Sequence, residues 1–289
     1  MKNRLHVYYL LFFFAFSIFA SCKKDDKTSL TPTPTPALYS TVLGKWTVIR
    51  PSSGRVQHNI ASKIQSPAEL TSIEFLNDST YVIVMGEDEV TTGTFTVTDS
   101  TSITLSGLGS LSEIKIANAK MDFKLFYNGS VLVLSANKAA EIALTGDTKL
   151  LCRTWYLTNT DSLYDDYENG TDKITVLFSA AGTYLVQNFR KDTLLEADIA
   201  NWKWHTSKPK TIIYWWDSEE PDENDAVTIT ELTGTSLKLT ETFTEGNNTE
   251  VYNYVLTPYV HSGRISQASM KKVVSSRHSS GRRLFGLHK

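Results

Sequence analysis

The stretch Phe75-Leu76-Asn77-Asp78-Ser79-Thr80-Tyr81 returns, about 100 residues later, as Phe178-Ser179-Ala180-Ala181-Gly182-Thr183-Tyr184, with the shared pattern F-x4-T-Y. Two further landmarks recur in the same order and at similar spacing on either side of this pattern. They are Trp46 with Trp155, and Gly129, Leu132 and Leu134 with Gly234, Leu237 and Leu239. The sequence therefore predicts two copies of one module, at residues 41–145 and 146–260.

Both copies consist of short segments rich in Thr, Val, Ile and aromatic residues. Apolar and polar residues alternate at 94–98, 102–105, 227–229 and 237–239, which places the apolar side chains on one face of a strand. Residues 112–121 and 137–144 are the only helix candidates. The pattern predicts an all-β protein with two tandem antiparallel barrel or half-barrel modules.

The two copies differ at their ends. Residues 241–259 of the second copy predict a hairpin around Gly246-Asn247-Asn248, whereas the first copy has only residues 135–144 at that point. We therefore expect that the first module lacks a closing strand or that the second module covers its open side.

Gly44-Lys45-Trp46 at the first strand, followed by F-x4-T-Y, is similar to the lipocalin-like domains of Bacteroidota lipoproteins. The resemblance covers residues 41–260 and implies up-and-down barrels in which Trp46 closes one end. The second copy has Arg153-Thr154-Trp155 and lacks the glycine. A shared fold does not by itself identify an activity.

The N-terminus resembles the signal peptide of a bacterial lipoprotein. Lys2 and Arg4 precede an apolar run at residues 7–20, and Ala20-Ser21 leads into Cys22, although Phe19 replaces the usual leucine. The resemblance implies cleavage before Cys22 and attachment of acyl chains such as palmitate to it. The alternatives are an ordinary signal peptide or an uncleaved anchor.

Residues 23–40 are expected to form a tether. Lys23, Lys24, Asp25 and Asp26 resemble the surface-export signal of Bacteroidota lipoproteins, although a solvated charge run is an equal alternative. The repeat Thr31-Pro32-Thr33-Pro34-Thr35-Pro36 can form neither a helix nor a sheet interior. The sequence predicts a lipid-anchored outer-membrane protein, on the periplasmic side or the cell surface.

The charge is unevenly distributed. Residues 23–260 hold 20 Lys and Arg against 31 Asp and Glu, so a nucleic-acid partner is not expected. Residues 261–289 hold seven Lys and Arg and no acid, and we expect this tail to be disordered. With 41% apolar residues in 289, the chain has room for two domains.

Catalytic signatures are missing from the sequence: we find no G-x-S-x-G, H-E-x-x-H, Walker or G-x-G-x-x-G motif. His58 and His205 fall in different modules, and Cys22 and Cys152 are the only cysteines. We expect no catalytic residues, no metal site and no cofactor, and we predict that the protein is not an enzyme.

Aromatic residues give the best indication of a ligand. Trp202 and Trp204 share a strand face, while the adjacent Trp215 and Trp216 must point to opposite faces. Exposed Trp and Tyr side chains stack on sugars or contact partner proteins. We propose Tyr184 and these four tryptophans as ligand-facing residues, with filling of the barrel end as the alternative for Trp202 and Trp204.

Four Asp-Ser or Asp-Thr pairs resemble O-glycosylation acceptors of Bacteroidota, although Asp-Ser is also common in turns. The acceptor residues are Ser79, Ser100, Ser162 and Thr193. Taken together, the sequence predicts a non-catalytic lipoprotein that binds a small apolar or glycan ligand or a partner protein. The alternative is a structural subunit of an outer-membrane complex.

Overall fold

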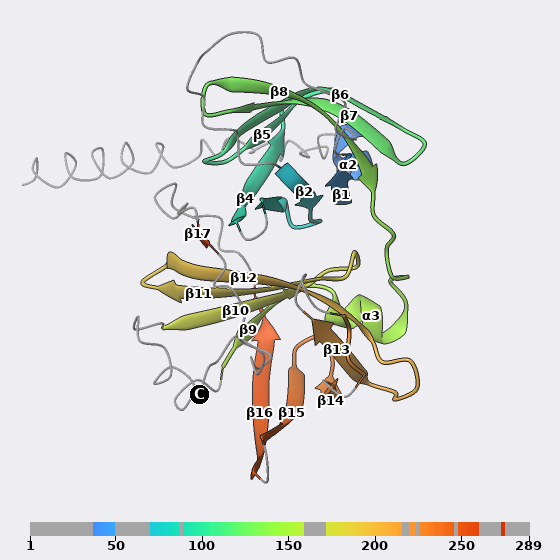
Figure 1. Cartoon of the computed structure of the whole chain (residues 1–289), viewed down its shortest axis with the longest axis vertical. Coiled ribbons are helices and arrows are strands. Elements are labelled where there is room, and N and C mark those ends of the chain that lie inside the picture. The colour runs from blue at the N-terminus through green and yellow to red at the C-terminus, as the bar shows by residue number, and fades with distance from the viewer. Residues whose placement is uncertain are drawn as a thin grey trace, which may run out of the picture. The chain divides into compact units, whose positions relative to one another are not determined.

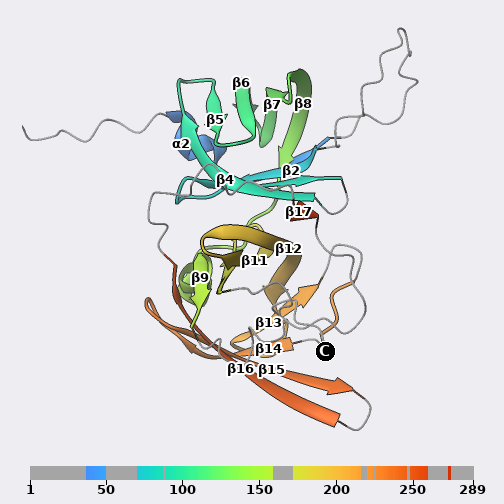
Figure 2. The same ribbon diagram turned by 90° about the vertical axis from the view of Figure 1, so that its left-hand side faces the viewer.

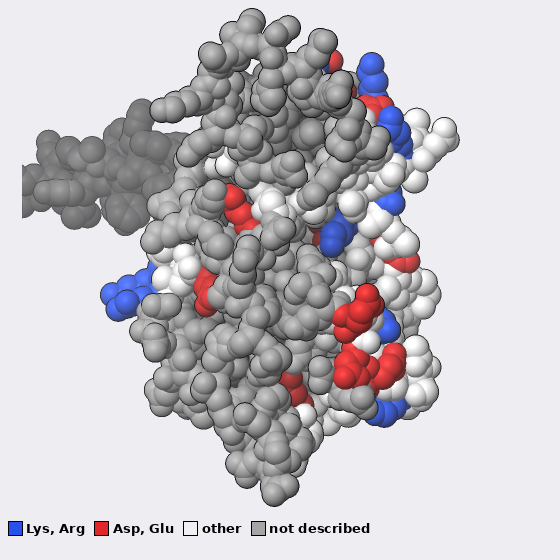
Figure 3. All heavy atoms as spheres, in the orientation of Figure 1, with Lys and Arg blue, Asp and Glu red and all other residues white. Residues whose placement is uncertain are grey.

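The structure is a computed structural model (Figures 1, 2 and 3). It describes residues 37–49, 70–86, 89–158, 172–215, 220–223, 226–245, 248–259 and 273–274. The segments predicted to be the signal peptide and the export signal, and nearly all of the predicted tether and basic tail, lie outside the described residues.

The first module is a ring of eight antiparallel strands preceded by the short helix α2 (Ala37–Val42). Each strand pairs with the next, and β8 pairs with β1. Strand β4 pairs with β3 along residues 89–94 and with β5 along residues 95–97, which completes the ring. The strands are β1 (Gly44–Val48), β2 (Leu70–Phe75), β3 (Thr80–Met85), β4 (Glu89–Val97), β5 (Ile103–Leu105), β6 (Gly109–Ala117), β7 (Lys120–Tyr127) and β8 (Ser130–Lys138).

The second module is a closed barrel preceded by the helix α3 (Gly146–Leu151). Its strands follow the same up-and-down order, and β16 closes onto β9. The strands β15 and β16 run side by side in both views (Figures 1 and 2). The strands are β9 (Thr154–Leu157), β10 (Lys173–Phe178), β11 (Thr183–Arg190), β12 (Thr193–Trp204), β13 (Thr211–Trp215), β14 (Ala226–Leu232), β15 (Leu237–Glu245) and β16 (Asn248–Pro258). The prediction of an all-β fold with two tandem barrel modules is confirmed.

Each module begins with the same helix, strand and tryptophan arrangement. The indole Nε1 of Trp46 donates to the carbonyl of Val42 at 2.7 Å, and that of Trp155 donates to the carbonyl of Leu151 at 2.9 Å. Both indoles are fully buried. A buried indole needs a partner for its N–H, and the last turn of each helix supplies a carbonyl that has no partner within the helix. The tryptophan thus fixes the helix against one end of each ring.

The F-x4-T-Y pattern is a hairpin in both modules. Phe75 pairs with Tyr81 and Phe178 with Tyr184, and all four side chains are buried. In the first hairpin the backbone N–H of Thr80 donates to Asp78 Oδ1 at 3.0 Å. In the second, the N–H of Thr183 donates to Ser179 Oγ at 3.1 Å. A side chain in the turn therefore holds the threonine in each copy.

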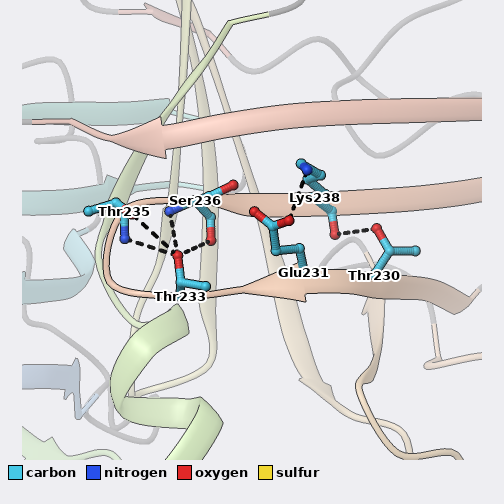
Figure 4. A network of polar contacts seen from close by, with 6 residues as sticks. All are labelled: Thr230, Glu231, Thr233, Thr235, Ser236 and Lys238. Atoms are coloured by element: carbon cyan, nitrogen blue, oxygen red, sulfur yellow. Dashed lines mark hydrogen bonds and ion pairs between the residues drawn. The ribbon is translucent and has the colours of Figure 1, made fainter.

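The predicted equivalence of Gly129 and Gly234, the third landmark of the repeat, is wrong. Gly129 precedes β8, the eighth strand of its module, whereas Gly234 precedes β15, the seventh strand of its own. Figure 4 shows the β14–β15 turn, in which Thr233 Oγ1 accepts the N–H groups of Thr235 at 3.2 Å and Ser236 at 3.0 Å. Glu231 and Lys238 form an ion pair at 2.8 Å beside it. The structural counterpart of this turn is the β6–β7 turn.

The misplaced landmark explains why the first module was expected to lack a closing strand. The true counterpart of the β15–β16 hairpin is β7–β8, and β8 closes the ring through the pair Trp46 and Lys138. The helix candidates at residues 112–121 and 137–144 are also wrong. The first stretch forms β6 and the start of β7, and the second is the end of β8 followed by a segment without regular structure. Alternation is hidden in β6 because its register shifts between Ser112 and Lys115.

Apolar side chains form one cluster inside each ring and a third cluster that draws residues from both modules. Val82 and Val90 of the first module pack with Leu177, Leu185 and others of the second. Strand β3 is buried at every position, and Val82 on its outer face lies in this third cluster. This explains its uninterrupted apolar run, Tyr81 to Met85, where a strand with one face in water would alternate.

Two boundaries differ from those expected. The helix α2 begins at Ala37, inside the stretch expected to be tether, and buries Leu38 and Val42 in the first core. Within the tail expected to be disordered, β17 (Val273–Val274) pairs with Val90 and Glu89 of β4.

Candidate functional site

The inner face of the second barrel is apolar at one end and polar at the other. Inward positions follow each other at every second residue of a strand. The apolar end holds Trp155, Phe178 and Trp202 beside Leu151 of α3. On the strands that lead away from this end, the inward side chains become polar. We call the following set the polar end: Asn188, Glu196, Asp198, Tyr214, Glu241, Tyr252 and Tyr254.

Strands β11 and β12 carry the first half of the polar end. Val186 belongs to the inner core and pairs with Asp198, and the next inward pair is Asn188 with Glu196. Asn188 and Asp198 are each only 1% exposed. Asn188 Nδ2 donates to Glu196 Oε2 at 3.5 Å, but its Oδ1 is buried with no hydrogen-bond partner. A buried acceptor without a donor is costly, and native proteins keep few of them.

Glu241 of β15 anchors the second half. This carboxyl is 5% exposed and lies two residues beyond the core residue Leu239 on the same strand face. Tyr214 Oη donates to Glu241 Oε1 at 2.7 Å, and Tyr254 Oη donates to Oε2 at 2.9 Å. Both phenol protons are therefore directed at the carboxyl group of Glu241.

The first module is a natural comparison because equivalent positions can be read from the strand pairing. Tyr81 pairs with Gly93 as Tyr184 pairs with Ala200. Trp46 pairs with Lys138 as Trp155 pairs with Pro258. Counting from these pairs, the first module has Met85, Thr91, Leu105, Leu125, Leu132 and Leu134 where the second has Asn188, Asp198, Tyr214, Glu241, Tyr252 and Tyr254.

Five of these six residues of the first module pack in or against its apolar core, and Thr91 is buried. Glu89, also buried, is the equivalent of Glu196, so the first module has two polar side chains, Glu89 and Thr91, among the seven positions. The second module differs from the first at the other five positions, where it has polar or tyrosine side chains in place of apolar ones.

The aromatic residues proposed to face a ligand lie in different settings. Tyr184 and Trp202 are buried, and Trp202 packs against Phe178 with ring centroids 5.6 Å apart. The indole of Trp202 donates to the carbonyl of Ser179 at 3.0 Å, and that of Trp204 donates to Thr148 Oγ1 of α3 at 2.9 Å. Tyr184 and Trp202 belong to the core cluster of the second barrel, and Trp204 packs against it.

Trp215 lies on the strand face opposite to Tyr214 and is partly exposed. Lys203 Nζ lies 5.9 Å from its ring centroid. Trp216 lies outside the described residues.

The proposed glycosylation residues occupy different settings. Ser100 is exposed in a turn where the N–H of Thr101 donates to Asp99 Oδ1 at 2.7 Å. Ser79 is partly exposed and its Oγ lies 3.2 Å from the Tyr39 hydroxyl. Thr193 is partly exposed and pairs with Arg190 at the start of β12. Ser162 lies outside the described residues, as do Cys22, Lys23, Lys24, Asp25 and Asp26.

Within the described ranges, no three His, Cys, Asp or Glu side chains are grouped so that they could hold a metal ion. No helix in the same ranges has the length and apolar character needed to cross a membrane. Figure 3 shows the described Lys and Arg side chains of one face in several separate places.

No protein-family model matches this sequence, and comparison with the curated proteins finds no match.

Sequence reasoning missed the polar end, although a signal for it was present. The alternation Leu237-Lys238-Leu239-Thr240-Glu241 places a carboxylate at an inward position, and counting back from Trp202 by twos reaches Asp198. A charged residue in phase with an apolar strand face is the signal that would have identified both.

Proposed function

We propose that this chain is a lipid-anchored outer-membrane protein whose second module binds a small polar ligand without catalysing a reaction. The observation that carries the proposal is the unpartnered Oδ1 of Asn188, buried beside Asp198 inside the barrel. A ligand with a hydrogen-bond donor would satisfy this atom.

The comparison between the modules supports the proposal. Polar groups inside a barrel cost desolvation, and well-packed apolar side chains of similar volume are often neutral or more stable. The first module has mainly apolar residues at the same positions. Residues that break the local pattern without a gain in stability are expected at functional sites.

The location of the ligand follows from the packing. The apolar end is filled by mutually packed aromatic rings and covered by α3, so we place the ligand at the polar end. This favours a ligand rich in hydrogen-bond donors, such as a glycan, over the apolar ligand that the sequence also allowed.

Native mass spectrometry of the protein purified from its own membrane tests this function. We expect a retained small molecule in the wild type and its loss when Asn188, Asp198 and Glu241 take the first module's residues, as Asn188→Met, Asp198→Thr and Glu241→Leu. A retained molecule that is unaffected by these substitutions would refute the site.

The same experiment tests the anchor. Acyl chains should add to the mass of a protein that begins at Cys22, and Cys22→Ala should move the protein from the membrane fraction to the soluble fraction. An unmodified N-terminus on membrane-bound wild type would contradict this part of the proposal.

A second candidate is the structural subunit of an outer-membrane complex. It is favoured by exposed apolar side chains on the outer face of β7 and β8, where Phe126 is 48%, Val131 58% and Val133 77% exposed. Phe126 and Val131 are a cross-strand pair. Chemical crosslinking in intact cells should join a partner to this face, and Val133→Lys should abolish the crosslink.

A further inference from the structure

We infer that the ligand of the polar end is an organic cation bearing amine or guanidine groups. This inference rests on the proposed function and narrows the ligand class. The structural observation is an inner surface that presents acceptor atoms and aromatic faces.

The acceptors come from both halves of the polar end. Asn188 Nδ2 donates to Glu196 Oε2, and Asn188 Oδ1 is an acceptor without a hydrogen-bond partner. Asp198 and Glu241, both buried, add carboxylate oxygens. The hydroxyls of Tyr214 and Tyr254 donate to Glu241.

The charge of the polar end is mainly negative. Three carboxyl side chains belong to it, and among the described inward positions on the strands of this barrel the one basic residue is Arg190, which is exposed at the end of β11. Carboxylates inside low-dielectric walls focus a negative potential, which raises the local concentration of cations. Charged hydrogen bonds of the amine-to-carboxylate kind are also about twice as strong as neutral ones.

The aromatic residues fit the same ligand. Tyr184 and Tyr214 lie with ring centroids 6.0 Å apart at the junction between the apolar and polar ends. Tyr214, Tyr252 and Tyr254 of the polar end carry π faces, which attract ammonium and guanidinium groups. A neutral sugar would satisfy Asn188 but would not use the negative potential.

Three isosteric probes separate charge from shape. We propose isothermal titration calorimetry of the full-length protein in detergent with 1,4-diaminobutane, 1,4-butanediol and succinate. We expect the diamine to bind and the diol and succinate to bind at least roughly tenfold more weakly. Asp198→Asn keeps the shape of the side chain, and it should weaken diamine binding by roughly ten- to hundredfold.

The matched control is Glu89→Gln. Glu89 is a buried acid on the inner face of the first module, at the position equivalent to Glu196. Its substitution should leave diamine binding unchanged. Circular dichroism of each variant checks that the fold is retained.

The outcomes separate this inference from the proposed function. A retained glycan in native mass spectrometry with no diamine binding overturns the cation inference and leaves the binding function standing. Diamine binding that survives Asp198→Asn and Asn188→Met overturns the assignment to the polar end. Absence of both a retained molecule and diamine binding overturns both proposals.

Discussion

The Glu241 network allows a test of whether the polar end serves function or stability. Tyr214→Phe and Tyr254→Phe each remove a hydrogen bond, of 2.7 and 2.9 Å, to a carboxyl that is 5% exposed. A hydrogen bond to a charged group contributes about 1.5–3 kcal/mol, so each single variant should lose about that much stability. The triple variant Tyr214→Phe, Glu241→Leu, Tyr254→Phe removes both donors together with the carboxyl that accepts from them. Its free energy of unfolding should lie within about 1 kcal/mol of wild type or above it.

Urea unfolding followed by tryptophan fluorescence measures these values for the second module, because five of the six tryptophans fall in its sequence. The control is Leu125→Met in the first module, a volume-conserving change that should cost less than about 1.5 kcal/mol. If the triple variant is less stable than either single variant, the network is structural. The argument that function retains the polar end would then fail.

Three further predictions follow from other contacts. Burial raises the pKa of Glu74 above its ordinary 4.5, against the lowering effects of Thr183, Ser179 and Lys45. The contribution of this protonation to stability is therefore fully present below pH 4.5 and is lost as the pH rises through the folded-state pKa. Glu74→Gln should make the melting temperature depend less on pH between pH 4 and 8. An unchanged dependence would contradict this prediction. Gly93→Ala should cost about 1–3 kcal/mol because the new Cβ would lie 2.8 Å from the Tyr81 hydroxyl oxygen, whereas Gly234→Ala, with no atom within 4 Å, should be neutral in the same denaturation assay. Burial, and to a smaller extent the charge of Glu74, raises the pKa of Cys152 to about 12. In a Cys22→Ala protein, a disulfide reagent at pH 7.4 should therefore react with Cys152 at least roughly a hundredfold more slowly than with free cysteine. Rapid labelling would show that the thiol is not protected.

Local patterns predicted the architecture well. The F-x4-T-Y hairpin and the tryptophan of the first strand are short-range devices, since the residues that hold them lie within a few positions of each other. Alternation on β4, β5, β14 and β15 also predicted strands, because one face of each strand contacts the core.

The failures came from interactions between distant residues. Gly129 and Gly234 look alike but begin strands of different rank, which only the pairing of β8 with β1 reveals. Trp202 and Trp204 were correctly placed on one strand face, but the sequence does not show that Ser179 and Thr148 receive their N–H groups. The polar end is assembled from β11, β12, β13, β15 and β16, so no single segment displays it.

The third apolar cluster limits how this chain can be divided. Leu177, Leu185 and Ala197 of the second barrel lie in that cluster with Val82 and Val90, and Gln187 Nε2 donates to Thr92 Oγ1 of the first module at 3.0 Å. A shortened chain that starts at Gly146 would present these apolar side chains to water, and strand faces of this kind promote aggregation. Use of the second barrel alone, for example as a sensor, would first require polar substitutions at Leu177, Leu185 and Ala197. In the duplicated chain, each module therefore buries apolar side chains on the outer face of the other.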